Sequence, residues 1–521
     1  MPFPASRTLR LLPLASLISL IGSFACGDNA NIPSAPNVPP ALGVAGPAWW
    51  SFARDPQHTA VSAIATQDLN RIAWLAPLDL APQQTGGELL LHYGSPVVTS
   101  FNTVILPVKT GAAGGFRVEA RSGVNGGLIW AADSDYVPPP HDWLPSYNMA
   151  LTRANSLYAP GSGGKLLVRD AADSPAGTVR SLVFYGAATY AANPAAYDGT
   201  VFIDTPITID SAGNAFFGFL VTGTNPANLV GGIARIDASG AGNWVAAAAA
   251  ANDPAVVKVA MNSAPALSND QATVYVAVNA AAEQKGYLVA LDSTTLAAKS
   301  RVLLLDPRDG QPALVTDDAT ASPTVGPDGE VFFGVQEAVS GTHNGRGWLL
   351  HFDAGLTTGL VPGGFGWDDT PSVVPASMVP SYTGTSRYLL MTKYNNYAGI
   401  GIGDGKSRLA VLDPTASQTD PISGEPIMLE VLTILGPTSD SSAPGAVKEW
   451  CINTAAVDPL TNSVLVNSED GFLYRWDLSS NAFTQRIQLT SGIGEAYTPT
   501  AIGADGAVYA VSNAVLFSIA K

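Results

Sequence analysis

Cysteine is almost absent from this chain of 521 residues, which contains only Cys26 and Cys451. Two cysteines so far apart exclude a disulfide framework, a zinc knuckle and a C-x-x-C-H haem attachment motif. Charge is also scarce, at 13% of residues, and 42 acidic side chains outnumber 26 basic ones to give a net charge of −16. A chain this acidic is poorly suited to bind a phosphate backbone, so we expect no nucleic-acid partner.

The apolar run from Leu11 to Phe24 is too short to span a bilayer comfortably. It follows Arg7 and Arg10, and the small residues Ser23 and Ala25 stand at positions minus three and minus one from the first cysteine. A positive start, a short apolar run and a small-residue cleavage site are typical of a secretory signal. The sequence therefore predicts that residues 1–25 form a signal peptide.

Cleavage at this point would leave Cys26 at the start of the mature chain. This arrangement resembles a bacterial lipoprotein, which implies a lipid on Cys26 and a place in the periplasm, in the outer membrane or at the cell surface. Ser23 departs from the resemblance, because such signals usually carry Leu there, and plain secretion is the alternative. Residues 26–47 are rich in proline and lack a periodic pattern, so they predict a flexible tether.

Helical periodicity is missing as well, because 52 glycines and 39 prolines interrupt the chain too often for a helical bundle. With 46% hydrophobic residues the chain can still bury a large core. A short unit recurs about every 55 residues: a Ser/Thr-Pro-like pair, two β-rich runs, and a strand of the form Gly-x-apolar-x-apolar-Asp. The units start at Ser95-Pro96, Ala150, Thr205-Pro206, Ala264-Pro265, Ser322-Pro323, Met378, Ala455 and Thr498-Pro499.

Six of these units have an aspartate at the end of their last predicted strand. Aspartates at regular spacing suggest a metal ladder, but one per unit places them on separate sheets. We therefore expect each carboxylate to cap its own turn, as aspartate commonly does. The six are Asp170, Asp237, Asp292, Asp353, Asp413 and Asp477.

Repeated units of short strands predict an all-β fold, an eight-bladed β-propeller of four-stranded antiparallel blades, because each sheet must bury both faces against its neighbours. The last unit, from Thr498 to Lys521, is long enough for only three strands. Residues 71–78 form a strand that belongs to no unit, so we expect it to complete the last blade and remove a free sheet edge. Residues 48–521 then form a single domain. Seven blades remain the alternative, because the spacing is irregular around Met378 and Ala455.

The segment from Trp49 to Ala60, WWSFARDPQHTA, precedes Ile72-Ala73-Trp74 and then repeats with Ala-Leu-Asp-like ends. This order resembles the proteins with PQQ-like repeats, the quinoprotein-type β-propellers, over about residues 47–521. The resemblance implies an eight-bladed propeller and says little about activity, because one fold hosts many functions. The tryptophan-docking pattern of the family survives in loosened form at Ala120–Trp130 and Asp237–Trp244.

The resemblance also sets an expectation about the cofactor. A quinoprotein alcohol dehydrogenase would be expected to carry a vicinal cysteine pair above its quinone. Cys451 is the only cysteine of the propeller body, so that pair cannot exist here. We therefore expect no bound PQQ.

Polar residues gather in the segments that lead into each unit, which we call the lead-in segments. In a propeller these segments surround the central channel on one face, where ligands commonly bind. We expect a polar, acidic binding site on that face, and scattered solvated loops are the alternative. The candidate ligand-binding residues are His92, His141, Asp142, Lys258, Asp317, Asp318, Trp367, Asp368, Asp369, Glu449, Trp450 and Glu495.

Closely set carboxylates can bind calcium through oxygen ligands, or can act as an acid and a base. The calcium hypothesis uses Asp368, Asp369, Glu449 and Glu495, and the sequence assigns no catalytic residue. His343, in a long loop, is expected at the surface. The glycine-rich run from Gly399 to Gly405 is expected to be a hairpin loop and not a phosphate cradle, because no helix follows it.

Two classes of function fit the sequence. The first is a monomeric, lipid-anchored binding or scaffold propeller outside the cytoplasm, with an envelope protein or a small molecule as its partner. The second is an enzyme that uses the same face, either a quinone-dependent dehydrogenase or a carboxylate- or calcium-assisted hydrolase or lyase. We expect the binding role.

Overall fold

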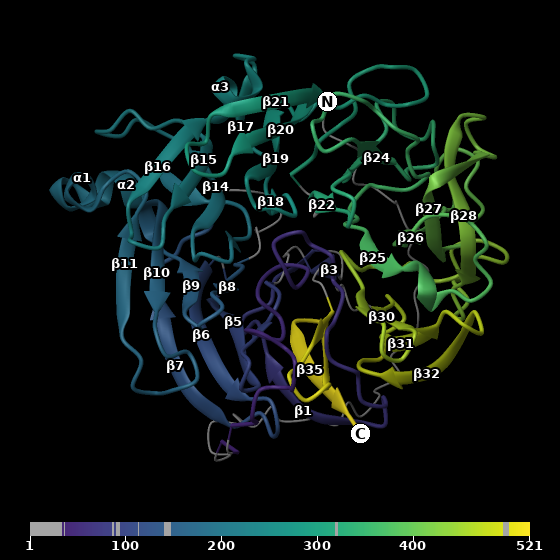
Figure 1. The fold of residues 1–521 in the computed structure, drawn as a ribbon, viewed down its shortest axis with the longest axis horizontal. Coiled ribbons are helices and arrows are strands. Elements are labelled where there is room, and N and C mark those ends of the chain that lie inside the picture. The colour runs from purple at the N-terminus through teal and green to yellow at the C-terminus, as the bar shows by residue number, and fades with distance from the viewer. Residues whose placement is uncertain are drawn as a thin grey trace, which may run out of the picture.

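The computed structural model describes residues 34–35, 37–85, 88–89, 94–112, 114–139, 147–317, 321–492 and 500–521. Their strands form eight antiparallel sheets arranged as blades around a centre (Figure 1). This confirms the predicted all-β, eight-bladed propeller. The signal peptide and Cys26 lie outside the described residues.

The first four blades follow one another along the chain. Blade one contains β4 (Val97–Val98), β5 (Thr103–Gly111), β6 (Gly114–Ser122) and β7 (Leu128–Ser134). Blade two contains β8 (Ala150–Leu151), β9 (Leu157–Pro160), β10 (Lys165–Arg169) and β11 (Val179–Val183). Blade three contains β12 (Val201–Ile203), β13 (Thr208–Ile209), β14 (Ala215–Val221), β15 (Gly232–Ile236) and β16 (Gly242–Ala246). Blade four contains β17 (Val256–Val259), β18 (Ala266–Leu267), β19 (Thr273–Ala280), β20 (Gly286–Asp292) and β21 (Ala298–Leu303).

The other four blades complete the ring. Blade five contains β22 (Thr324–Val325), β23 (Val331–Val335) and β24 (Trp348–Phe352). Blade six contains β25 (Ser372–Pro375), β26 (Tyr388–Tyr394), β27 (Arg408–Thr419) and β28 (Pro426–Leu435). Blade seven contains β29 (Ala456–Asp458), β30 (Ser463–Asn467), β31 (Phe472–Asp477) and β32 (Ala482–Gln488). Blade eight contains β33 (Ala501–Ile502), β34 (Val508–Ser512), β35 (Val515–Ala520) and the N-terminal β1 (Arg71–Pro77).

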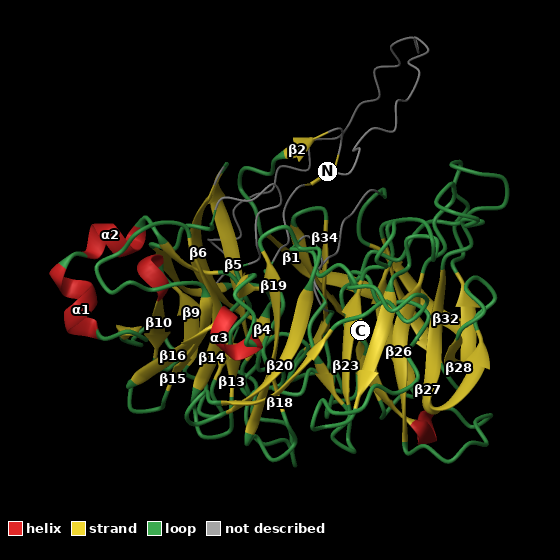
Figure 2. Cartoon of the chain, turned by 90° about the horizontal axis from the view of Figure 1, so that it is seen from above, coloured by secondary structure: helices red, strands yellow, loops and turns green. Residues whose placement is uncertain are grey.

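Short elements decorate this ring. A small hairpin, β2 (Gln84–Thr85) and β3 (Glu88–Leu89), follows β1. The helices α1 (Ala187–Ala192) and α2 (Pro194–Asp198) project at the periphery, α3 (Ala247–Ala251) follows β16, and two turns are 3-10 helices, η2 (Ser162–Gly164) and η3 (Ala376–Met378) (Figure 2). In the described part of the chain, no helix has the length and apolar character that crossing a membrane requires.

Two blades depart from the simplest plan. In blade five, residues 359–363 occupy the outer position without forming a regular strand, and they bridge β24 at the pairs Leu349–Gly363 and Phe352–Gly359. In blade six, the innermost strand starts at Ser372, whereas the sequence placed the start of this unit at Met378. Met378 lies in η3 instead, so that expectation is wrong. Thr370-Pro371, directly before β25, is the pair that marks this blade.

The position of a strand in its blade determines its sequence pattern. The second strands lie between neighbouring blades and are buried on both faces, so they read as continuous apolar runs, as in β23 (VFFGV). The outer strands have one solvated face, and β32 accordingly alternates between exposed and partly buried residues. The core is therefore a series of apolar layers between blades.

The N-terminal strand closes the ring. β1 pairs antiparallel with β35, and the paired residues run from Arg71–Ala520 to Pro77–Val515. The Trp74 indole N–H donates to the Gly123 carbonyl oxygen of blade one at 2.9 Å, and its ring lies against Gly126 and Tyr509. Blade eight is thus fastened to both ends of the chain and to the first blade, as the sequence predicted.

Residues 49–60, which we call the hub segment, cross the centre of the ring. The innermost strands would otherwise leave backbone N–H groups unpaired, and such groups are costly when buried. Carbonyl oxygens of the hub segment accept hydrogen bonds from one such N–H in each of six blades. The pairs are Trp49–Val98, Trp50–Leu151, Pro56–Leu267, Gln57–Val325, Thr59–Val373 and Ala60–Val457.

The hub segment has an unusual backbone. Ala53, Arg54, His58 and Ala60 all have positive φ, which side chains other than glycine rarely adopt. Such a conformation costs on the order of 1–3 kcal/mol per residue and persists where surrounding contacts enforce it. Here it lets successive carbonyl groups point to different blades. The family-like sequence motif is therefore the part of the chain that connects the blades at the centre.

Candidate functional site

The structure divides the predicted site residues into three sets. His92, His141, Asp142, Asp318 and Glu495 lie outside the described residues. Lys258 and Asp317 meet between blades four and five, where Lys258 Nζ contacts Asp317 Oδ2. The remaining candidates gather around blades six and seven. They are Trp367, Asp368, Asp369, Glu449 and Trp450.

The pair of Lys258 and Asp317 is a buried polar network without an adjoining ligand cavity. Asp317 Oδ1 accepts from the Met261 backbone N–H at 3.0 Å and from Asn279 Nδ2 at 3.1 Å, and Asn279 Oδ1 accepts from Lys258 at 3.1 Å. Burial raises the pKa of the Asp317 carboxyl, but Lys258 and these hydrogen bonds outweigh burial and lower it. Each charge is compensated by its neighbours, as buried charges require. This network connects blades four and five.

Asp204, in the middle of the split inner strand of blade three, lies near this network. It is 1% exposed, and neither carboxylate oxygen has a hydrogen-bond partner among the described residues. Burial raises the pKa of Asp204 to about 8; Lys258 opposes this rise and Asp317 adds to it. Asp204 is therefore held as a neutral acid at pH 7.

A cavity of about 370 Å³ lies between blades five, six and seven. Its walls come from the lead-in segments of blades six and seven and from the loops between the second and third strands of blades five and six. The lining residues are Gln336, Ser340, Gly345, Trp367, Asp368, Lys393, Asn395, Tyr397, Ile400, Glu449, Trp450 and Cys451. Four of the residues singled out in the sequence, Trp367, Asp368, Glu449 and Trp450, thus share one cavity.

Charges on the floor of this cavity are paired within the protein. Lys393 Nζ donates to Asp368 Oδ2 at 3.1 Å, and both side chains are nearly fully buried. Burial lowers the pKa of Lys393, but Asp368 and Asp369 outweigh burial and raise it. Asp369 accepts a hydrogen bond from Thr392 Oγ1 and is not among the lining residues. Burial raises the pKa of Asp369 to about 7, against the effect of Lys393.

The aromatic walls are fixed by Asn395. Its Oδ1 accepts from the Trp450 backbone N–H at 3.1 Å, and its Nδ2 donates to the Trp450 carbonyl at 3.2 Å. Nδ2 also lies 3.5 Å from the Tyr397 hydroxyl oxygen. The rings of Trp367 and Tyr397 lie 6.4 Å apart at 75°, so they form a corner. Burial raises the pKa of Tyr397, and the carboxylates of Glu449 and Asp368 raise it further.

Sequence reasoning missed Lys393, Asn395 and Tyr397. They lie at and just beyond the end of β26, far from any lead-in segment in the sequence. One signal was present, because Lys393 interrupts an otherwise apolar run, YLLMTKY, in a second strand. A lysine in such a strand must be paired when it is buried.

The four-carboxylate calcium hypothesis stays a prediction. Among the described residues, no three His, Cys, Asp or Glu side chains lie close enough together to hold a metal ion. Asp368 is paired with Lys393 and Asp369 with Thr392, while Glu495 lies outside the described residues. The six turn aspartates also act as expected: for example, Asp237 Oδ1 accepts from the Ser239 and Ala241 backbone N–H groups.

His343 is not at the surface, so that expectation is wrong. It is 0% exposed and stacks on Trp348 with ring centroids 3.9 Å apart. Nδ1 lies 2.8 Å from the Gly347 carbonyl oxygen and Nε2 lies 3.1 Å from Asp420 Oδ2. Both neighbours only accept, which favours the doubly protonated ring. His343 therefore joins its loop to the β27–β28 hairpin as a buried cation.

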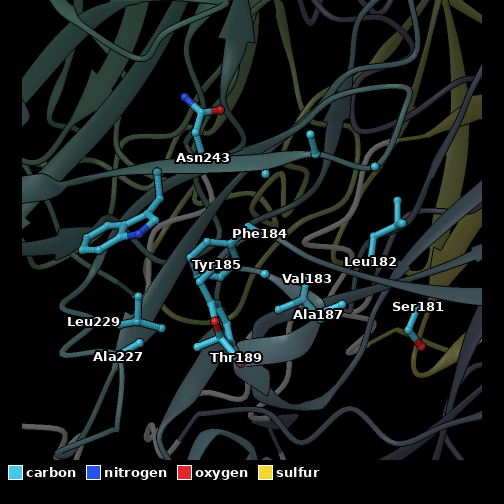
Figure 3. A pocket seen from close by; sticks show the side chains of 15 residues that line it. Ser181, Leu182, Val183, Phe184, Tyr185, Ala187, Thr189, Ala227, Leu229 and Asn243 are labelled. Atoms are coloured by element: carbon cyan, nitrogen blue, oxygen red, sulfur yellow. The ribbon is translucent and has the colours of Figure 1, made fainter. Parts of the chain in front are cut away.

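A larger cavity, about 660 Å³, lies at the outer edge between blades two and three (Figure 3). It is lined by β11, the start of α1 and β16, with Leu182, Tyr185 and Trp244 among its side chains. No lysine, arginine, histidine or acidic residue lines it. We therefore place the candidate functional site in the smaller cavity, where charged and aromatic side chains converge.

Comparison with known proteins shows the fold alone. No sequence-family model and no curated protein matches the chain. A europium-containing methanol dehydrogenase is 11% identical with a TM-score of 0.52, and the match covers 89% of each chain. Quinohemoprotein alcohol dehydrogenase from Comamonas testosteroni is 12% identical with a TM-score of 0.53, over 90% of this chain and 80% of its own. BamB from Moraxella catarrhalis is 13% identical with a TM-score of 0.40, over 80% of this chain and 91% of its own. The two dehydrogenases establish that the β-propeller architecture of this chain is shared with quinoproteins.

Proposed function

We propose that this chain is a non-catalytic binding propeller that works outside the cytoplasm, held by a lipid on Cys26 and a tether, and that it binds a small ligand in the 370 Å³ cavity. The observation that carries the proposal is the convergence of two lead-in segments and two loops on this cavity. Its volume is within the usual range for small-molecule sites. Neither a quinone nor a metal enters this role.

Binding is favoured over catalysis by the state of the charged groups. A hydrolase or lyase would need an acid and a base that both face the substrate. The two buried aspartates whose pKa is raised toward or above neutrality, Asp204 and Asp369, do not line the cavity. Of the charged residues that do, Lys393 and Asp368 are committed to each other. An arrangement of this kind fixes the shape of a pocket.

A thermal-shift screen of the purified chain against small metabolites tests the proposal. We expect ligands that raise Tm, and we expect this effect to be lost in Trp367→Leu, because Trp367 forms a wall of the cavity. Trp244→Leu is the matched control, because Trp244 lines the outer-edge cavity instead. Ligands whose effect persists in Trp367→Leu would place binding elsewhere. Turnover of an alcohol when PQQ and calcium are supplied would instead support the dehydrogenase.

A further inference from the structure

The accessible walls of the 370 Å³ cavity are aromatic. Trp367 and Tyr397 are half-buried, and their rings meet at 75° with centroids 6.4 Å apart. Two rings in this arrangement present their faces or edges to one small volume, which is the geometry that surrounds an alkylated ammonium group in aromatic cages. Ile400, 39% exposed, borders the same space. A ligand here therefore meets π faces and apolar surface first.

The charge of the walls is negative. Lys393 is the only basic side chain among the lining residues, and it is ion-paired with Asp368 and lies beside Asp369. Glu449 adds a further carboxylate, close enough to the Tyr397 hydroxyl to raise the pKa of Tyr397. The chain as a whole carries −16. An anionic ligand would meet this field unfavourably, and a cation favourably.

Polar partners for a sugar are few in this cavity. The Asn395 amide is occupied by the Trp450 backbone and the Tyr397 hydroxyl, and the Lys393 ammonium by Asp368. Gln336 Oε1, a buried lining atom without a partner in the described residues, can only accept. The indole N–H groups of Trp367 and Trp450 are unpartnered donors, but they lie at ring edges. Recognition by acceptors and ring faces suits a cation better than a polyol.

We infer that the cavity between blades five, six and seven is a binding site for a small organic cation of the alkylammonium class, seated in the corner of Trp367 and Tyr397 with the Glu449 carboxylate beside it. This inference rests on the proposed function, because it names the ligand class of the same cavity. No bond is made or broken in it. The positive charge is balanced by Glu449, and the alkyl groups replace water on the two rings.

Calorimetric titration of the full chain with choline and with dimethylbutanol, its neutral carbon isostere, tests the ligand class. We expect choline to bind about tenfold or more tightly than the isostere, because the two differ only in charge. Trp367→Leu and Glu449→Gln should each weaken choline binding about tenfold. Trp244→Leu and Glu425→Gln, at positions outside the cavity, are matched controls that should bind choline like the parent chain.

The outcomes separate the two claims. If dimethylbutanol, glucose or acetate binds at least as well as choline, and Trp367→Leu abolishes that binding, the cavity is a ligand site and the cation inference is overturned. If no compound of the metabolite screen binds, or if binding is indifferent to Trp367, both the proposed function and the inference fail. Circular dichroism spectra and Tm values like those of the parent chain are required of each variant, and Tyr397→Phe, which keeps the ring, should retain choline binding.

Discussion

Asp204 and His58 are buried ionisable side chains that the fold holds in their uncharged forms. Asp204 lies at the inner strand of blade three without a hydrogen-bond partner for its carboxylate in the described residues. His58, in the hub segment, is 0% exposed, and its Nδ1 lies 2.7 Å from the Pro323 carbonyl oxygen. Because a carbonyl oxygen only accepts, Nδ1 carries the proton of a neutral ring. Each residue should leave a distinct mark on the pH dependence of stability.

Replacing Asp204 with Asn should stabilise the protein at neutral and alkaline pH. The pKa of Asp204 is about 8 in the folded chain against 3.8 for an ordinary aspartate, so folding requires proton uptake between these values and becomes less favourable as pH rises. We expect Asp204→Asn to raise the free energy of unfolding by about 2 kcal/mol or more at pH 8 and to have little effect at pH 4. Urea unfolding at both pH values measures this, and an equal effect at the two would contradict the assignment.

His58 should make the protein less stable in acid. Burial lowers its pKa from 6.5 to about 4, against the Pro323 hydrogen bond and the Asp55 charge. Between pH 6.5 and 4 the unfolded chain therefore binds the extra proton, and the free energy of unfolding falls by about 3 kcal/mol as pH is lowered. In His58→Gln, which keeps an N–H donor for Pro323, this part of the fall should be missing. An unchanged pH profile in that variant would show that His58 is not the group responsible.

At the scale of the structural element, β1 carries the closure of the ring. Its Trp74 is 6% exposed, donates to Gly123 of blade one, and packs on Tyr509 of blade eight. Gly126 leaves room for the indole, because a Cβ there would lie 2.8 Å from the ring. One side chain thus contacts both blades at the seam of the ring.

Trp74→Ala should destabilise the protein by about 3–5 kcal/mol, through the lost apolar burial and the cavity that remains. Trp74→Phe keeps most of the ring and should cost much less. Equilibrium unfolding of both variants by guanidinium measures these changes. Trp244→Ala, at the partly exposed outer edge of blade three, is the matched control, and a similar loss there would argue against a special role for the seam.

The blades could be predicted from the sequence because their signals are local. A Pro-containing start, an apolar second strand and a turn aspartate recur in most units, and Asp170, Asp237 and Asp292 cap turns as expected. The start of blade six was misplaced at Met378, since Thr370-Pro371 lies before an unusually long unit that contains the extended β27–β28 hairpin. The hydrogen bonds of the hub segment could not be predicted. They join residues hundreds of positions apart and depend on four positive φ angles.

The candidate site was predicted in part for a similar reason. Trp367, Asp368, Glu449 and Trp450 belong to lead-in segments, whose position on one face follows from the fold. Lys393, Asn395 and Tyr397 come from the end of β26 and the loop beyond it, and their approach to Trp450 is set by packing between blades six and seven. The burial of His343 was missed because its partner, Asp420, is 77 residues away.

At the scale of the whole molecule, the lipid anchor can be tested separately from the fold. If Cys26 is the mature N-terminus and carries a lipid, labelling of producing cells with palmitate should mark the protein. Cys26→Ala should remove the label, while Cys451→Ala, which changes a buried thiol of the propeller, should keep it. A label that persists in Cys26→Ala would contradict the anchor, and absence of label in the parent chain would favour plain secretion.

The central claim is that the eight blades form a ring closed by β1 against β35, since the cavity exists only if the blades stay in this order. Spin labels at Arg71 and Lys521, both exposed and adjacent across that pairing, test it most directly, with Cys26→Ala preventing labelling at the first cysteine. The account predicts strong dipolar broadening of the EPR spectrum from labels on neighbouring strands, lost on unfolding. A spectrum without broadening in the native protein, as from labels far apart, would contradict the closed ring.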